Sequence, residues 1–257
     1  MSHYKKYRIL NPENCQRVVE EVFAFKKTHY TLENLEKHVA YLADEKPGRY
    51  SHAYAISGPT ASPILPGIPF ENLIQYPAIA KLTLAMERIL GFQLDSRFLL
   101  NMQEYYSANA AVPKHFDGEL LDFEVQGDKL KINKAIRPKD VAVLVLVNDV
   151  GPVGTRIHYP DGSEEMVICE AGEVVIFDNA NCFHSVDAFN AVSKRDDKLV
   201  RLTLGWRSLN TNTVFYDGKQ NSEISQGSAD AITESWFKSD WPGKWQAIKE
   251  QASRAAF

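Results

Sequence analysis

The chain has 257 residues, of which 44% are hydrophobic and 24% charged, as in an ordinary soluble globular protein with a sizeable core. Its formal net charge of −4, without any basic block, argues against nucleic acid or an anionic membrane as a partner. Three cysteines without a CxxC pair, short apolar runs and a polar start predict a cytoplasmic chain lacking disulfides, a membrane span and a signal peptide.

The N-terminal third is predicted to be mainly helical. A first helix follows Asn11, which can cap it, and its apolar stripe continues to about residue 27. A second helix is expected to begin at Thr31. Residues 46–76 are rich in Pro, Gly and Ser and are expected to form a long loop, followed by a third helix over residues 77–91.

Short apolar or alternating segments separated by turns then follow one another. Eight segments at this spacing predict a β-sandwich or barrel, at residues 97–107, 120–127, 141–149, 155–162, 165–172, 173–179, 183–189 and 199–209. The tail is expected to return to helix at about 228–238 and 242–256. We expect one domain over residues 1–257, with helices and a loop in 1–96, the β-core in 97–209 and C-terminal helices in 210–257.

Three candidate metal ligands come from two distant segments. His115 and Asp117 flank Phe116, and their i, i+2 spacing predicts that both lie on one face of a strand. His184 follows a later predicted strand. Two imidazoles and one carboxylate form a facial triad that leaves coordination positions open, as Fe(II) requires to bind substrate and O₂. Taken alone, however, Asp117-Gly118 favours a surface turn.

The last predicted strand alternates polar and apolar residues. One face carries Arg201, Thr203, Gly205 and Arg207, and the other face is apolar. An arginine that faces a barrel interior is costly without an anionic partner. A dicarboxylate would supply that partner through a bidentate contact with Arg201, and Thr203 could donate to the same carboxylate.

The ordered pattern His115-Phe116-Asp117, then His184, then Arg201-Leu202-Thr203 resembles the HxD…H…RxS/T pattern of the Fe(II)/2-oxoglutarate-dependent oxygenase superfamily, with Thr in place of Ser. The resemblance covers roughly residues 97–209. It implies a mainly β fold with flanking helices, the double-stranded β-helix or jelly roll. It implies Fe(II), 2-oxoglutarate and O₂ as cofactors, with Tyr105 where a tyrosine of the family often points at 2-oxoglutarate.

The resemblance also implies a dioxygenase reaction, in which oxidative decarboxylation of 2-oxoglutarate to succinate and CO₂ drives oxidation of an unactivated C–H bond. Because Asp117 stands where halogenases of this superfamily carry Gly or Ala, we expect a hydroxylase, or another oxidation such as desaturation. A free amino acid or a related small metabolite is the preferred substrate. Candidate substrate-binding residues are Arg207, Arg49 and Glu119, each of which also has a simpler interpretation as a surface or turn residue.

Two other functions fit parts of the pattern. One is a non-enzymatic jelly-roll binding module, and the other is a cupin-type metal enzyme, which binds its metal with more histidines and needs no 2-oxoglutarate. Only the oxygenase requires a buried arginine to bind a dicarboxylate, so a buried Arg201 would favour it over the binding module and the cupin-type enzyme. His158 and Cys182 are expected to be a strand histidine beside a turn and a buried thiol. Oligomeric state and the carbon that is oxidised stay open.

Overall fold

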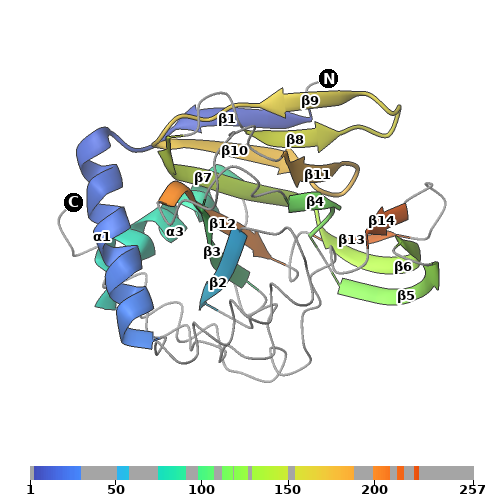
Figure 1. Ribbon diagram of the computed structural model, residues 1–257, viewed down its shortest axis with the longest axis horizontal. Coiled ribbons are helices and arrows are strands. Elements are labelled where there is room, and N and C mark those ends of the chain that lie inside the picture. Colours follow the sequence, from blue (N-terminus) through green and yellow to red (C-terminus); the bar gives the residue numbers. More distant parts are fainter. Residues whose placement is uncertain are drawn as a thin grey trace.

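The structure is a computed structural model. It describes residues 3–29, 51–57, 75–90, 98–106, 112–117, 119–126, 129–149, 154–187, 199–208, 213–216 and 223–225. Most of these segments are antiparallel strands, arranged in three sheets, and helices lie along one side (Figure 1).

Two sheets form the centre of the fold. The first has the order β1 (Tyr4–Arg8), β10 (Glu173–Asp178), β7 (Asp140–Asn148), β12 (Leu199–Ser208), β3 (Phe98–Tyr106) and β2 (Ser51–Ser57). The second has the order β4 (Val112–His115), β11 (Phe183–Val186), β8 (Thr155–His158) and β9 (Glu164–Val167). From β3 onward the chain passes repeatedly between these two sheets, and all the pairings are antiparallel. This is the predicted jelly roll.

A third sheet, of four strands, is built mainly from the chain segment between β4 and β7. Its strands β5 (Glu119–Gln126) and β6 (Lys129–Pro138) pair with each other along their length. Strands from the tail, β13 (Thr213–Tyr216) and β14 (Glu223–Ser225), pair with the two ends of β6. This sheet therefore joins the middle of the chain to the segment that follows the jelly roll.

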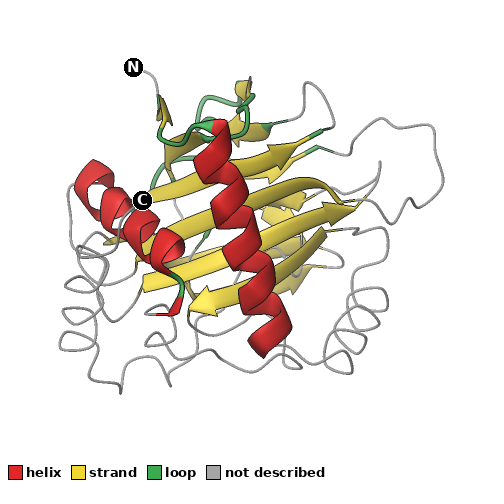
Figure 2. Ribbon diagram, turned by 90° about the vertical axis from the view of Figure 1, so that its left-hand side faces the viewer, coloured by secondary structure: helices red, strands yellow, loops and turns green. Residues whose placement is uncertain are grey.

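Helices α1 (Pro12–His29) and α3 (Pro77–Leu90) cover the outer face of the first sheet (Figure 2). The Asn11 side chain caps α1 by accepting a hydrogen bond from the Asn14 backbone N–H at 2.8 Å. The buried stripe of α1 packs in one cluster with sheet residues such as Leu144 and Trp206. Among the described helices, none has the length and apolar character needed to cross a membrane.

The alternation of side chains along the strands gives the first sheet two different faces. Leu202, Leu204 and Trp206 belong to the cluster beneath the helices. A second cluster, which includes Val145, Ile157 and other residues of both central sheets, fills the space between the sheets. Arg201 and Thr203 alternate with Leu202 and Leu204, so they face this interior, as predicted.

Several strands were not predicted. β1 lies ahead of the first helix, and β2 lies within residues 46–76, where a loop was predicted; that prediction is wrong for residues 51–57. β1 is a largely exposed edge strand, held by backbone pairing with β10 and lacking apolar alternation. β6, β13 and β14 were also missed. The helices expected from Thr31 and over residues 228–238 and 242–256 lie outside the described residues.

Candidate metal centre

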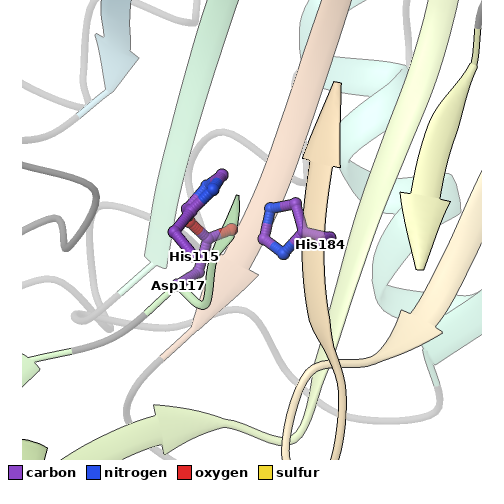
Figure 3. Close-up of side chains that lie close together, drawn as sticks. All are labelled: His115, Asp117 and His184. Carbon is purple, nitrogen blue, oxygen red and sulfur yellow. The ribbon is translucent and has the colours of Figure 1, made fainter. Parts of the chain in front are cut away.

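The side chains of His115, Asp117 and His184 come together inside the jelly roll (Figure 3). Each offers one ligand atom, and these atoms lie within 4.8 Å of one another. His115 is the last residue of β4 and is paired directly with His184 on β11. Their ring centroids are 4.0 Å apart. All three side chains are buried, so the antiparallel pairing of two short strands places both imidazoles in a protected space.

Asp117 is held differently from the two histidines. β4 ends at His115, so the expectation that His115 and Asp117 share one face of a strand is wrong for Asp117. The carboxylate Oδ1 nevertheless lies 3.9 Å from His115 Nε2. The Asp117 backbone N–H donates to the side-chain oxygen of Asn179 at 2.9 Å. A side-chain contact therefore replaces the missing strand pairing at this position.

The donor set of this cluster fits a divalent transition metal. Imidazole nitrogen suits Fe(II) and its neighbours in the first transition row, and two histidines with one carboxylate bind it without saturating it. Phe177 packs against the His184 ring at 4.6 Å between centroids, which limits the orientations open to this imidazole. The three residues thus form a compact ligand group with an apolar wall.

Arg201 lies in the same interior and is 1% exposed. It pairs across the sheet with Tyr105 on one side and Asn148 on the other. Its guanidinium carbon lies 5.1 Å from the centroid of the buried Tyr105 ring. Within the described part of the chain, Arg201 Nε and Nη1 have no hydrogen-bond partner. A buried guanidinium in this state calls for an anionic ligand, and Thr203, also buried, lies two residues along the same face.

The three predicted substrate-binding residues cannot be related to the centre. The backbone of Arg207 pairs with Leu99 in β12 and β3, and Glu119 begins β5, but both side chains lie outside the described part of the structure. Arg49 lies entirely outside the described residues. Their roles stay predictions.

His158 and Cys182 lie near the ligands, and neither belongs to the ligand group. His158 Nδ1 is 2.7 Å from Glu164 Oε1, and its Nε2 is 2.8 Å from Ser185 Oγ, so both ring nitrogens are engaged. Burial lowers the pKa of His158. Burial also raises the pKa of Cys182 to about 11, so its thiol stays protonated at neutral pH. His158 is thus a buried strand histidine beside a turn and Cys182 a buried thiol, as expected from the sequence.

Two fully buried polar residues behind the ligands were not predicted. The Arg137 guanidinium lies 4.2 Å from the Phe116 ring centroid and 5.2 Å from that of Phe183, and Nη2 donates to the Cys182 carbonyl at 2.6 Å. Asn179 is the other. In the sequence, Arg137 sits in a strand whose strict alternation is interrupted, and Asn179 resembles any turn asparagine.

Comparison with protein-family models and with curated proteins gives no significant match. Among solved structures, the chain is similar to a Trichoplax adhaerens prolyl hydroxylase in complex with a hypoxia-inducible-factor peptide, at 11% identity and a TM-score of 0.47, covering 80% of this chain and 84% of that one. It is also similar to a Pseudomonas putida prolyl-4-hydroxylase, at 18% identity and a TM-score of 0.42, covering 81% and 94%.

A third similar structure is the α-ketoglutarate-dependent carbocyclase SnoK from nogalamycin biosynthesis, at 12% identity and a TM-score of 0.42, covering 85% of this chain and 83% of that one. Similarity at this level transfers no function. The motif residues themselves give the resemblance. The chain resembles the Fe(II)/2-oxoglutarate-dependent oxygenases in its HxD and distal histidine, which meet inside a jelly roll, and in the buried arginine of its RxT motif.

Proposed function

We propose that the protein is an Fe(II)- and 2-oxoglutarate-dependent dioxygenase that hydroxylates an unactivated C–H bond of a small substrate. One observation carries the proposal. The two-histidine, one-carboxylate group shares the interior of the jelly roll with Arg201, a buried cation whose Nε and Nη1 have no partner among the described residues. The first feature fits the metal and the second fits the dicarboxylate.

Each residue has a defined task in this proposal. His115, Asp117 and His184 would hold the metal and leave its remaining positions for 2-oxoglutarate and O₂. Arg201 would bind the far carboxylate of 2-oxoglutarate through two parallel hydrogen bonds, and the Thr203 hydroxyl would donate to the same carboxylate. Tyr105 would pack beside them. When bound, iron and 2-oxoglutarate supply the oxidising chemistry, while the buried walls exclude water.

The alternatives fit the structure less well. A binding module with no anionic ligand would leave Arg201 buried at a high cost in free energy. A cupin-type centre usually has more histidines, whereas the ligand group found among the described residues has two histidines and Asp117. The carboxylate also supports hydroxylation rather than halogenation, because it fills the position that a halide would need.

Anaerobic titration of the protein with Fe(II) and 2-oxoglutarate tests the proposal. We expect the weak visible charge-transfer band of a 2-oxoglutarate chelate, followed by succinate formation when air is admitted. The Arg201→Met variant is the matched comparison, since it should bind metal but require much more 2-oxoglutarate to develop the band. Absence of both band and succinate in the native protein would rule out the proposed activity.

The substrate class is proposed on chemical grounds. Arg207, Arg49 and Glu119 are the charged residues that we assign to a free amino acid or a related metabolite. Each of the twenty amino acids would be incubated with the enzyme, Fe(II), 2-oxoglutarate and air. A product heavier by one oxygen, formed together with succinate, would identify the substrate; succinate without any such product would move the search to other small acids and amines.

A further inference from the structure

Asp117 is the ligand that the strand pairing does not hold. The ladder between β4 and β11 pairs His115 with His184 and Val112 with Val186, and it ends there. Asp117 lies two residues beyond the end of β4. The backbone of Asp117 is therefore positioned by contacts other than the β4–β11 ladder.

Asn179 provides such contacts through every hydrogen-bonding group of its amide. Its Oδ1 accepts from the Asp117 backbone N–H at 2.9 Å, and its Nδ2 donates to the Asp117 carbonyl at 2.9 Å. Nδ2 also donates its second hydrogen to the Pro138 carbonyl, at 2.7 Å. Asn179 is fully buried. Because two carbonyls and one N–H surround it, only an amide satisfies all three groups; a carboxylate would repel both carbonyls.

The place of Asn179 in the chain connects Asp117 to the second histidine. Asn179 begins the turn between β10 and β11, and His184 lies on β11 directly after this turn. The turn is braced at its base, where the Cys182 N–H donates to the Asp178 carbonyl at 3.0 Å. Asn179 therefore fixes the Asp117 backbone against the same turn that delivers His184.

An independent contact joins the same two ligand segments. Arg137 stacks on Phe116, which lies between His115 and Asp117, and on Phe183, which precedes His184. The two phenylalanine rings also meet edge to face at 5.8 Å. Arg137 is next to Pro138, whose carbonyl binds Asn179. The end of β6 is thus the common anchor for the segments on both sides of the metal centre.

We propose that Asn179 is a positioning residue that sets the distance between the Asp117 carboxylate and the two imidazoles, and thereby the affinity of the centre for its metal. The inference rests on metal binding by His115, Asp117 and His184 as in the proposed function. It assigns the geometry of the group to a residue that contributes no ligand. Outer-shell partners of metal ligands commonly change metal affinity by about 10–100-fold when they are altered.

The test is Co(II) binding, measured by calorimetry and by the visible spectrum of the bound ion, in the full chain under anaerobic conditions. The near-isosteric Asn179→Asp variant should bind Co(II) about 10–100-fold more weakly and with a changed spectrum. Asn179→Ala, which buries no new carboxylate, should weaken binding in the same direction and serves if Asn179→Asp fails to fold.

The matched control is Thr83→Val. Thr83 accepts a hydrogen bond from the indole N–H of Trp206 at 3.1 Å in the buried layer beneath the helices, away from the ligand group. This variant also loses a buried hydrogen bond, and it should keep the native Co(II) affinity and spectrum. Near-UV circular dichroism and thermal unfolding of the metal-free proteins establish that each variant is folded.

The outcomes separate this inference from the proposed function. Native affinity in Asn179→Asp or in folded Asn179→Ala would overturn the positioning role alone. An equal loss in Thr83→Val would overturn it as well, because affinity would then follow general stability. If the native protein bound no Co(II) at all, the metal-dependent function itself would be wrong, and this inference would fall with it.

Discussion

Asp117 supplies the carboxylate of the ligand group, and its removal leaves two imidazoles in the buried space. Asp117→Ala should therefore lower the rate of succinate formation by at least about 100-fold, since even outer-shell changes cost about 10–100-fold in metal affinity or activity. The assay measures succinate released from 2-oxoglutarate under air. Asp161→Ala, which alters a carboxylate in the exposed turn between β8 and β9, should be as active as the native protein. Full activity in Asp117→Ala would exclude Asp117 as a ligand.

Arg201 is predicted to govern 2-oxoglutarate affinity and to leave metal affinity unchanged. Truncating one partner of a buried, hydrogen-bonded charge pair costs about 2–5 kcal/mol, so Arg201→Met should raise the 2-oxoglutarate dissociation constant by about 30-fold or more. The measurement is a 2-oxoglutarate titration of the Co(II)-loaded protein. The Co(II) dissociation constant, measured separately, should match that of the native chain; a change in both constants would point to a general disturbance of the interior.

Among single residues, the sequence identifies the candidate metal ligands but not the asparagine that holds one of them. His115, Asp117 and His184 could be selected because their types and order match a known chemistry, and alternation around Arg201 predicts the face on which it lies. Asn179 could not be separated from Asn181, two residues later, because both are asparagines of one turn. Their difference is tertiary: Asn179 is buried against Asp117, and Asn181 is exposed.

One carboxylate links the two helices in addition to their shared apolar cluster. Glu21, on α1, accepts hydrogen bonds from the backbone N–H groups of Ala78 and Ile79 at 2.9 and 3.0 Å, at the N-terminus of α3. These are N–H groups that a helix cannot satisfy internally. Glu21→Ala should lower the free energy of unfolding by about 1–2 kcal/mol, the usual cost of losing an N-terminal cap. Urea denaturation measures this, and Glu20→Ala on the exposed side of α1 should change little.

An ion pair couples β8 to the residue that follows β11. Arg156 Nε lies 3.0 Å from both carboxylate oxygens of Asp187, and these bonds hold the pKa of Asp187 below its ordinary value. Because the pKa is lower in the folded state, the pair stabilises the fold above the ordinary carboxyl pKa of about 3.9 and loses this effect as the pH falls through the lower, folded value.

Asp187→Asn should therefore reduce stability at neutral pH and make unfolding less dependent on pH in the acid range. The reduction should be less than about 1 kcal/mol, since both side chains are partly exposed and screened by water. Urea denaturation at several acidic and neutral pH values gives the slope. High salt should shrink the difference between native protein and variant at neutral pH; a difference that is insensitive to salt would argue against an ionic origin.

Among the strands, those buried on one or both faces are the ones that the sequence predicts. β7 and β10 have runs of apolar residues, and β12 alternates apolar with polar residues, so the sequence predicts both the type and the extent of these strands. β1 and β2 are the two edge strands of the first sheet. They are held by backbone hydrogen bonds, which leave no pattern in the amino-acid sequence. Because the alternation of buried residues breaks between Ile132 and Ala135, the sequence does not predict β6. It therefore does not predict the contacts that Arg137 and Pro138 make beside the ligand group.

For the molecule as a whole, metal binding should appear as thermal stability. A ligand that binds only the folded state at 100 times its dissociation constant adds about 2.7 kcal/mol, which for a protein of this size raises the melting temperature by about 5–10 °C. The metal-free protein would be melted with increasing Co(II), and a chelator should reverse the rise. Asp117→Ala should show a much smaller shift. An equal shift in that variant would place the bound ion elsewhere.

The order of apolar segments predicts a β-sandwich or barrel, and the family resemblance narrows this to a jelly roll; neither predicts how the two sheets meet. Eight segments of alternating residues predict a sandwich or barrel, and only pairing registers such as His115 with His184 show which strands are neighbours. Long-range pairing of this kind leaves no local sequence signal. The N-terminal strand is the extreme case, since Tyr4 pairs with Phe177.

Because the paired strands are far apart in the sequence, the residues of the ligand group are synthesised at different times. During synthesis, His115 and Asp117 leave the ribosome well before Asn179 and His184, and Arg201 follows later still. A nascent chain that ends before Asn179 therefore has neither a complete set of donors nor the contact that holds Asp117. Folds dominated by such distant contacts form slowly. The complete ligand group can therefore form only after β11 has been synthesised and has paired with β4.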